Sequence, residues 1–265
     1  MAEINEWNRA LVTGASCGIG QAIAEQLADE GTDLVLVARN QDRLEALADR
    51  LPVDVEVIDA DLSGIGPDPE QRARVEARLA GEHRPVDLLV NNAGVGVSGS
   101  FSSLAIEELD TMMNLNIVAA HRLAHIAAQT MAPRGRGGIL NVSSVAGYLP
   151  SSQSATYGAS KAFLTSLSRS IRHEMVEQGA EVKVTALCPG LTRTEFQQRA
   201  GIDLSHLPDF LWQQASEVAA AGLKGLADNK AVVVPGLINQ VAVGTAKLLP
   251  QPLMDLAAKA MSAKR

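Results

Sequence analysis

Short apolar runs recur along the chain, and the stretches between them carry the apolar spacing of amphipathic helices. The runs are rich in Val, Leu and Ile without polar alternation, which is typical of strands buried on both faces of a sheet. They predict seven strands, at residues 9–14, 33–39, 53–59, 86–92, 137–144, 182–188 and 230–236. The stretches between them predict helices at about residues 18–31, 41–51, 68–81, 104–132 and 155–178.

This alternation predicts an α/β fold, a doubly wound parallel sheet of about seven strands with helices on both faces. The strands form one unbroken series without an internal repeat or a low-complexity linker. We therefore expect a single domain over residues 1–265.

The composition narrows the class of protein. The chain has 265 residues, 46% of them hydrophobic and 20% charged, and a net charge of −7. An acidic chain lacks the basic surface that general nucleic-acid binding needs, so no nucleic-acid partner is expected. No uncharged apolar stretch reaches the length of about 20 residues that a membrane span requires. Cys17 and Cys188 make no disulfide framework and the N-terminal MAEINEWNRALV is not a signal peptide, so we expect a cytoplasmic enzyme or binding domain.

A glycine-rich turn, TGASCGIG, follows the first predicted strand and precedes an amphipathic helix. Its glycines Gly14, Gly18 and Gly20 would let the backbone approach a pyrophosphate, and the helix N-terminus favours negative charge. A tight strand-to-helix turn without a ligand also uses glycine, so the position after the first strand is what favours dinucleotide binding. The spacing is Gly-x3-Gly-x-Gly rather than G-x-G-x-x-G.

The second predicted strand ends in Ala38-Arg39. In a dinucleotide-binding fold a carboxylate at this place binds the ribose 2′-hydroxyl of NAD, whereas an arginine accommodates the 2′-phosphate of NADP. Arg39 therefore favours NADP(H). The alternative is a solvated arginine at a strand end.

Tyr157 precedes Lys161 by four residues in SATYGASKAFL, and residues i and i+4 are neighbours on a helix. A cation about 4 Å from the phenol would contribute roughly 4 kcal/mol at an effective dielectric near 20, or about 3 pKa units. Lys161 could then prepare the phenol to exchange protons near neutral pH. Tyr and Lys also meet at this spacing on many solvated helices.

Taken together, these motifs resemble the short-chain dehydrogenase/reductase family over about residues 8–236. The family's TGxxxGxG is matched from Thr13 to Gly20, and its YxxxK by Tyr157 and Lys161. The remaining family motifs are matched by the NNAG of Asn91, Asn92, Ala93 and Gly94, the helix residue Asn116, Ser144 beside Ser143, and Pro189, Gly190 and Thr194.

The resemblance implies a Rossmann-type fold and hydride transfer between a nicotinamide cofactor and a carbonyl or secondary alcohol. It implies that Tyr157 is the general acid and base, that Ser144 holds the substrate oxygen, and that Lys161 lowers the tyrosine pKa and binds the ribose. Asn116 would hold a water that links Lys161 to solvent. The cofactor-binding residues implied in the same way are Gly14, Ser16, Cys17, Gly18, Ile19, Gly20, Arg39, Asp61, Leu62, Asn92, Ala93, Gly94, Tyr157, Lys161, Pro189, Gly190 and Thr194.

Two departures from the family pattern bear on the cofactor and on the C-terminus. Cys17 is neutral where NADP-dependent members often carry a basic residue, so Arg39 is nearly the only positive charge expected against the 2′-phosphate. NADPH is the expected cofactor, and NAD is the alternative. Many members end soon after an Asp-Gly-Gly at the seventh strand, whereas residues 237–265 here show two helical patterns split by prolines. That tail could cover a neighbouring subunit, extend the pocket or touch a membrane surface.

The insertion at residues 194–229 should select the substrate. Phe196, Phe210 and Trp212, three of the eight aromatic residues in the chain, lie between residues 194 and 214. With neighbouring Ile and Leu residues they predict an apolar lid, which indicates a medium-sized, fairly apolar carbonyl or alcohol as substrate. An ordinary core helix is the alternative.

The two longest predicted helices carry more apolar residues than one sheet face needs. They predict a homodimer through residues 104–132 and 155–178, with a tetramer less secure. A metal is not expected, because His121 and His125 have no evident third ligand. Two other classes of protein are alternatives. A non-catalytic NAD(P)-binding regulatory protein would not need the phenol, and a sugar-nucleotide epimerase would need a larger C-terminal domain.

Overall fold

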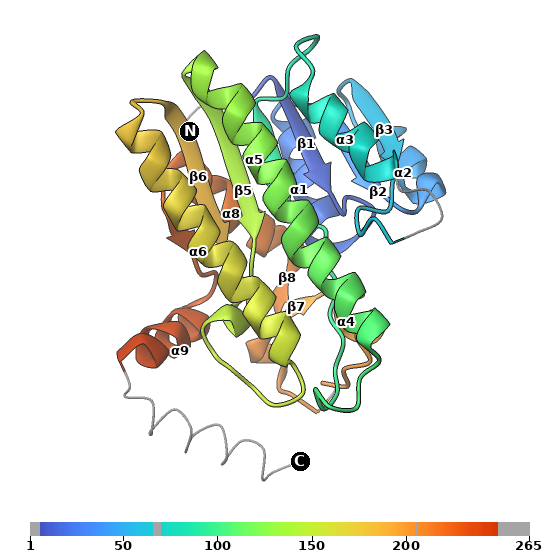
Figure 1. Cartoon of the computed structure of the whole chain (residues 1–265), viewed down its shortest axis with the longest axis vertical. Coiled ribbons are helices and arrows are strands. Elements are labelled where there is room, and N and C mark those ends of the chain that lie inside the picture. The colour runs from blue at the N-terminus through green and yellow to red at the C-terminus, as the bar shows by residue number, and fades with distance from the viewer. Residues whose placement is uncertain (1–5, 66–69, 205, 249–265) are drawn as a thin grey trace.

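The structure, a computed structural model, describes residues 6–65, 70–204 and 206–248. Its centre is a seven-stranded parallel sheet in the order β3-β2-β1-β4-β5-β6-β9 (Figure 1). This confirms the predicted doubly wound fold of Rossmann type. The strands are β1 (Arg9–Thr13), β2 (Asp33–Ala38), β3 (Val55–Asp59), β4 (Leu88–Asn91), β5 (Arg136–Val142), β6 (Glu181–Leu187) and β9 (Val232–Val233).

Helices cover both faces of the sheet because successive strand residues point to opposite sides. In β1, Val12 faces one apolar core and Leu11 the other. The first core is closed by α1 (Gly18–Asp29), α2 (Gln41–Ala48) and α8 (Ala215–Ala227). The second is closed by α3 (Glu70–Ala80), α5 (Ala120–Met131) and α6 (Ala155–Glu177), of which α5 and α6 cross the sheet in front in Figure 1.

The predicted helix at 104–132 is divided into three helical segments. It consists of α4 (Ile106–Met113), the π-helical segment η1 (Asn114–Ala119) and α5. A π-helical turn widens the helix by one residue and is often found at functional sites. Here the wide turn contains Asn116, which is buried.

The carboxyl ends of the parallel strands meet at one edge of the sheet, where ligands bind in folds of this type. Thr13 pairs in register with Val37 of β2, and Asn91 of β4 pairs with Asn141 of β5. The chain order reverses between β1 and β4, which are neighbours in the sheet. The loops after β1, β2, β4, β5 and β6 therefore converge on one edge.

The insertion at 194–229 is not a lid over its whole length, and the prediction is wrong for its second half. Residues 192–214 form two short strands, β7 (Thr192–Arg193) and β8 (Gln213–Gln214), with α7 (Phe196–Arg199) and the 3-10 turn η4 (Asp209–Leu211) between them. Helix α8 instead belongs to the core, since Val218 and Leu226 are fully buried against the sheet. The apolar spacing of α8 reflects packing on the sheet.

The C-terminal part differs from the prediction in a second way. The strand expected at 230–236 pairs with β6 only at Val232 and Val233. Helix α9 (Leu237–Leu248) follows. The second helical pattern of the predicted tail lies outside the described residues. In the described part of the chain, no helix combines the length and apolar character needed to cross a membrane.

Candidate active site

The glycine turn joins β1 to α1 in a conformation that glycine permits. Gly14 has a φ of 66° and Gly18 a φ of 58°, in the left-handed region. A Cβ on Gly14 would lie 2.7 Å from the Asn92 amide nitrogen, so the turn is packed tightly against the loop after β4. Cys17, the residue before α1, makes no side-chain capping bond, which leaves the helix N-terminus available to an anion.

Thr13 and Asn92 tie the first turn to the loop after β4. The Thr13 hydroxyl accepts hydrogen bonds from the Asn92 backbone N–H at 2.9 Å and the Ala93 N–H at 3.0 Å. The Asn92 side-chain amide donates to the carbonyl of Thr13 at 2.9 Å and that of Gly14 at 3.1 Å. Asn92 thus orders the glycine turn by hydrogen bonds to the backbone of Thr13 and Gly14.

Asn116 holds the next part of that loop from the π-helical turn. Its side chain accepts from the Val95 N–H and donates to the Val95 carbonyl, both at 2.9 Å. It also donates to the Ser160 hydroxyl at 3.2 Å. A Cβ on Gly94 would lie 3.2 Å from the Asn116 oxygen and 3.3 Å from the Lys161 Nζ. Gly94, Asn116 and Lys161 therefore meet at one point.

The two serines after β5, Ser143 and Ser144, make different hydrogen bonds. The Ser143 hydroxyl is buried and lies 2.7 Å from both the Lys161 carbonyl and the Thr165 hydroxyl. Ser144 begins the 3-10 turn η3 (Val145–Gly147), where its Oγ accepts from the Ala146 N–H at 3.1 Å. Ser144 is the one that forms a side-chain hydrogen bond with Tyr157. Ser144, not Ser143, therefore faces the phenol.

Helix α6 presents Tyr157 and Lys161 on one face, as their spacing predicts. The Lys161 Nζ lies 5.7 Å from the centroid of the Tyr157 ring and donates to the Val142 carbonyl at 2.9 Å. The Tyr157 ring also packs against Phe196 of α7, with the ring centroids 5.4 Å apart. The phenol is thus placed between the end of β5 and the segment after β6.

Burial is the main cause of the shifted pKa values of Tyr157 and Lys161. It raises the pKa of Tyr157 to about 12, although the residue keeps part of its surface exposed, and the hydrogen bond to Ser144 acts in the opposite direction. Burial lowers the pKa of Lys161 to about 8. The lowered phenol pKa expected from the sequence is not found here, because desolvation of the phenolate outweighs its stabilisation.

The segment after β6 closes the site from the other side. The Pro189 carbonyl accepts from the Val145 N–H at 3.0 Å and from the Ser144 hydroxyl at 3.4 Å. Gly190 leaves room for the Asn239 side chain, which a Cβ would overlap. Thr194 packs on the glycine turn, since a Cβ on Gly18 would lie 2.9 Å from its methyl group.

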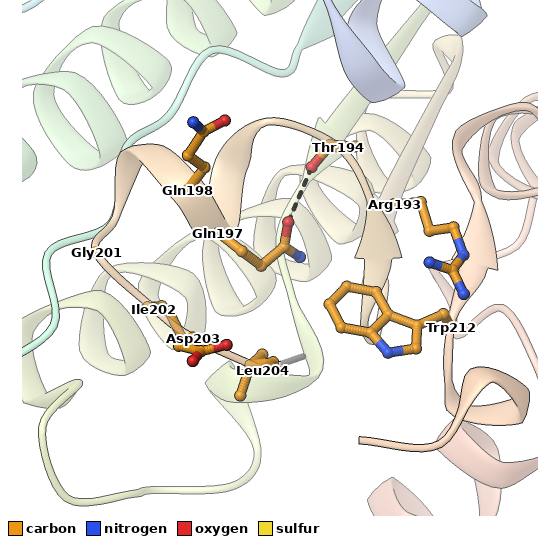
Figure 2. A pocket seen from close by; sticks show the side chains of 9 residues that line it. All are labelled: Arg193, Thr194, Gln197, Gln198, Gly201, Ile202, Asp203, Leu204 and Trp212. Atoms are coloured by element: carbon orange, nitrogen blue, oxygen red, sulfur yellow. Dashed lines mark hydrogen bonds between the residues drawn. The ribbon is translucent and has the colours of Figure 1, made fainter. Parts of the chain in front are cut away.

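Beside Thr194 lies an open hollow of about 550 Å³ (Figure 2). Trp212 stands at one end, with the Arg193 guanidinium 5.5 Å from its ring centroid, and the Gln197 and Thr194 side chains lie 3.4 Å apart. Ile202 and Leu204 line the opposite part. Among the predicted lid aromatics, Phe196 and Trp212 are half-buried here and Phe210 is exposed.

The residues expected at the adenine end lie at the ends of β2 and β3. Arg39 is exposed and makes no hydrogen bond or ion pair within the described part of the chain. The Asp61 carboxylate accepts from the Ser63 N–H at 2.9 Å, and Leu62 is buried. Ser16, Cys17 and Ile19 are half-buried on the glycine turn.

These residues fit a dinucleotide. Gly14 and Gly18 hold the turn in a left-handed conformation that glycine permits, and the N-terminus of α1 lacks a side-chain cap that would compete with an anion. Lys161 on α6 and the exposed Arg39 after β2 are cations that could pair with the negative charge of a dinucleotide. No cluster of three or more His, Cys, Asp or Glu side chains suited to a metal occurs among the described residues.

Three contacts around the site were not predicted from the sequence. The Phe196 ring was expected in the lid but not against Tyr157. The Cys188 thiol is buried 3.7 Å from the Thr165 hydroxyl, beneath Lys161, and burial raises its pKa. Arg43 forms an ion pair with Glu195, which is far from it in the sequence. These three contacts join segments far apart in the sequence, so no local pattern predicts them. Only the position of Cys188, directly before the Pro189 motif, indicates that it lies near the site.

Comparisons with known proteins agree with this arrangement. The family model described as short chain dehydrogenase matches residues 8–204. An uncharacterised oxidoreductase of Myxococcus xanthus is 33% identical over 264 residues, which is 98% of this chain and 99% of that protein.

Two solved structures are similar over most of their length. A short-chain dehydrogenase from Sphingobium yanoikuyae in complex with NADPH has 37% identity and a TM-score of 0.79, covering 92% of this chain and 96% of its own. A bulky-bulky ketone specific alcohol dehydrogenase from Comamonas testosteroni has 34% identity and a TM-score of 0.76, covering 92% and 95%.

Proposed function

The chain belongs to the short-chain dehydrogenase/reductase family, an NAD(P)-dependent class of oxidoreductases, and from this premise we propose its specific reaction. It interconverts a medium-sized, fairly apolar ketone and the matching secondary alcohol, with NADP(H) as the preferred cofactor. The observation that carries the proposal is that Tyr157 has both Ser144 and Lys161 as neighbours.

Bound NADP(H) supplies or accepts the hydride, and the protein manages the proton and the charge. Tyr157 donates its proton to the carbonyl oxygen as that oxygen gains negative charge, and its raised pKa keeps it protonated for this task at neutral pH. Ser144 donates a hydrogen bond to the same oxygen. The Lys161 ammonium, beside the ring, stabilises the phenolate that remains.

Asn116 and Asn92 support this chemistry indirectly. Asn116 holds the backbone of Val95 next to Lys161, and so positions the loop after β4. Asn92 holds the glycine turn. We assign the glycine turn to the pyrophosphate, Lys161 and Thr194 to the nicotinamide half and Asp61 with Leu62 to the adenine. Arg39 is assigned to the 2′-phosphate, because its guanidinium is exposed at the end of β2.

The substrate class rests on the apolar wall of the site. Phe196 packs on the catalytic phenol, and Ile202, Leu204 and Trp212 line the adjoining hollow. The similar Comamonas testosteroni enzyme is specific for ketones with two bulky groups. A ketone with bulky apolar substituents is therefore the substrate class that we assign.

The test is a screen of such ketones and alcohols that follows NADPH absorbance. We expect turnover of at least one bulky ketone, and much slower reduction of acetone. A protein that binds NADPH but turns over no carbonyl or alcohol would instead be the non-catalytic nucleotide-binding regulator.

A further inference from the structure

An ion pair joins two segments that the proposed reaction leaves without a role. Arg43 lies in the first turn of α2, and its Nη1 donates to both carboxylate oxygens of Glu195 at 3.0 Å. Glu195 immediately precedes α7. The two residues are 152 positions apart in the sequence.

The pair bridges the carboxyl edge of the sheet. Arg43 follows β2 and Glu195 follows β6, and the strands β1, β4 and β5 lie between these two in the sheet. Thr194, next to Glu195, packs on Gly18 of the glycine turn. Arg43 therefore joins α2 to the segment whose Thr194 packs on the glycine turn, the turn assigned to the pyrophosphate.

Local structure places both partners. The Asn40 side chain accepts from the Arg43 backbone N–H at 2.9 Å and so caps α2, which orders the first turn that carries Arg43. Glu195 also pairs with Arg199, one turn further along α7. The hydrogen bond from Arg43 is the main cause that lowers the pKa of Glu195, and the same bond raises the pKa of Arg43.

This pair is poorly suited to stabilising the fold. The Arg43 and Glu195 side chains are 47% and 41% exposed, and exposed ion pairs contribute little to the free energy of unfolding. The same small energy matters when it opposes the opening of a segment over a bound ligand, because each opening event must break it.

Resting on the proposed function, we propose that Arg43 and Glu195 form a clasp across the cofactor groove. The clasp consists of these two residues alone. While it is closed, the segment from Thr194 to Arg199 stays over the glycine turn, and the dinucleotide leaves only after the pair separates. Both are positioning residues that act through this segment and not on the reacting atoms.

The experiment measures the release of NADPH and of NADH by stopped-flow displacement from the preloaded protein. E195Q and R43Q should each accelerate release of both cofactors by about two- to fivefold, the factor that an exposed ion pair supports. The charge-swapped R43E/E195R should return release to within about twofold of wild type, because the pair is rebuilt in reverse. High salt should accelerate release from the wild type by a larger factor than release from E195Q, because it screens the Arg43–Glu195 pair in addition to the contacts with the cofactor phosphates.

R199Q is the matched control. It removes the other cation that pairs with Glu195, on the same helix, and leaves the link across the groove in place. Release from R199Q should stay within about twofold of wild type, because the exposed pair that it removes lies within α7 and does not cross to α2.

The outcomes are distinguishable. Wild-type protein that binds neither cofactor would refute the proposed function, on which the clasp rests. Normal binding with unchanged release in E195Q would overturn the clasp alone. Weakened binding of NADPH but not NADH in R43Q, without rescue in the swap, would also overturn it and would make Arg43 a ligand of the 2′-phosphate.

Discussion

At the scale of single residues, Tyr157 has two neighbours with opposite effects on its proton. Burial keeps the phenol protonated, while the hydrogen bond to Ser144 and the adjacent ammonium favour its ionised form. A group that must release and recover a proton in each turnover needs both influences. The hydroxyl, and not the ring, is therefore the part of Tyr157 on which the reaction depends.

Tyr157→Phe removes the hydroxyl and keeps the ring that packs on Phe196. We expect kcat to fall by about a hundredfold or more, the scale of acid–base catalysis, with the Kd for NADPH almost unchanged. Steady-state kinetics and fluorescence titration measure the two quantities. Turnover within about threefold of wild type would remove Tyr157 from the proposed mechanism.

Lys161 makes the stability of the protein depend on pH. Burial lowers its pKa from 10.5 to about 8. Between these values the unfolded chain holds a proton that the folded chain has released, so this group makes the free energy of unfolding rise with pH. In Lys161→Met that contribution is absent, and the difference between the two proteins should change by up to about 3 kcal/mol over this window.

Urea unfolding of the cofactor-free proteins between pH 7 and 10.5 measures this difference. Lys224→Met is the control, because it removes an exposed lysine, and its unfolding should follow the wild-type pH dependence. Parallel curves for all three proteins would show that Lys161 keeps an ordinary pKa.

Arg39 should decide between the two nicotinamide cofactors. NADPH should bind more tightly than NADH, because the exposed guanidinium can pair with the 2′-phosphate. Ala38→Asp with Arg39→Leu should reverse the order, since the carboxylate repels the phosphate and accepts from the ribose hydroxyl. Isothermal titration gives the four dissociation constants; equal values for the two cofactors in the wild type would refute the assignment.

At the scale of elements, the region between β6 and β9 combines two kinds of structure. Its first half, with α7 and η4, borders the site and keeps large side chains exposed, among them Phe210 at 71%. Its second half, α8, is a core helix in which Leu226 is fully buried. The two halves should therefore respond differently to truncation of a large apolar side chain.

Leu226→Ala should lower the free energy of unfolding by about 2–5 kcal/mol, through lost burial and the cavity left behind. Phe210→Ala should change it by less than about 0.5 kcal/mol, because the ring is already in solvent. If the Phe210 ring contacts the substrate, Phe210→Ala should raise KM for bulky ketones while the free energy of unfolding stays nearly unchanged. Equal destabilisation by both changes would contradict the division between border and core.

At the scale of the whole molecule, the expected dimer surface is smaller than the sequence suggests. Leu123, Leu164 and Ile171, apolar residues of the two helical ranges expected to form the dimer, are buried within one chain. Val118 and Phe163 remain exposed on η1 and α6, and Phe163 lies beside His121 of α5, with ring centroids 6.3 Å apart. We propose that this exposed patch, joined by Met113 and Ile106 of α4, pairs with its twofold mate.

Phe163→Glu should weaken that contact, because it places a charge at the centre of an isologous surface, where the same residue meets its mate. Light scattering at micromolar concentration should give about twice the chain mass of 27.9 kDa for the wild type, or a larger multiple, and a lower mass for the variant. NADPH binding by the variant should be retained. A wild-type mass near 27.9 kDa would show a monomer and remove the proposal.

The sequence was sufficient for the seven strands of the sheet, for the helices up to α6 and for the motif residues at the strand ends. Strands buried on both faces must be apolar throughout, and a glycine turn or an i, i+4 pair is local, so each can be identified without knowledge of its surroundings. The parallel sheet then follows, and with it the convergence of Gly14, Asn92, Ser144 and Thr194 at one edge.

The tertiary structure alone decided what each of those residues touches. The π-helical turn at Asn116 and the core position of α8 both depend on packing between segments far apart in the chain. The same holds for the pKa of Tyr157, since burial is a property of the whole fold. The Arg43–Glu195 pair is the extreme case, because no local pattern links two residues 152 positions apart that meet only when α2 and the start of α7 are brought together by the fold.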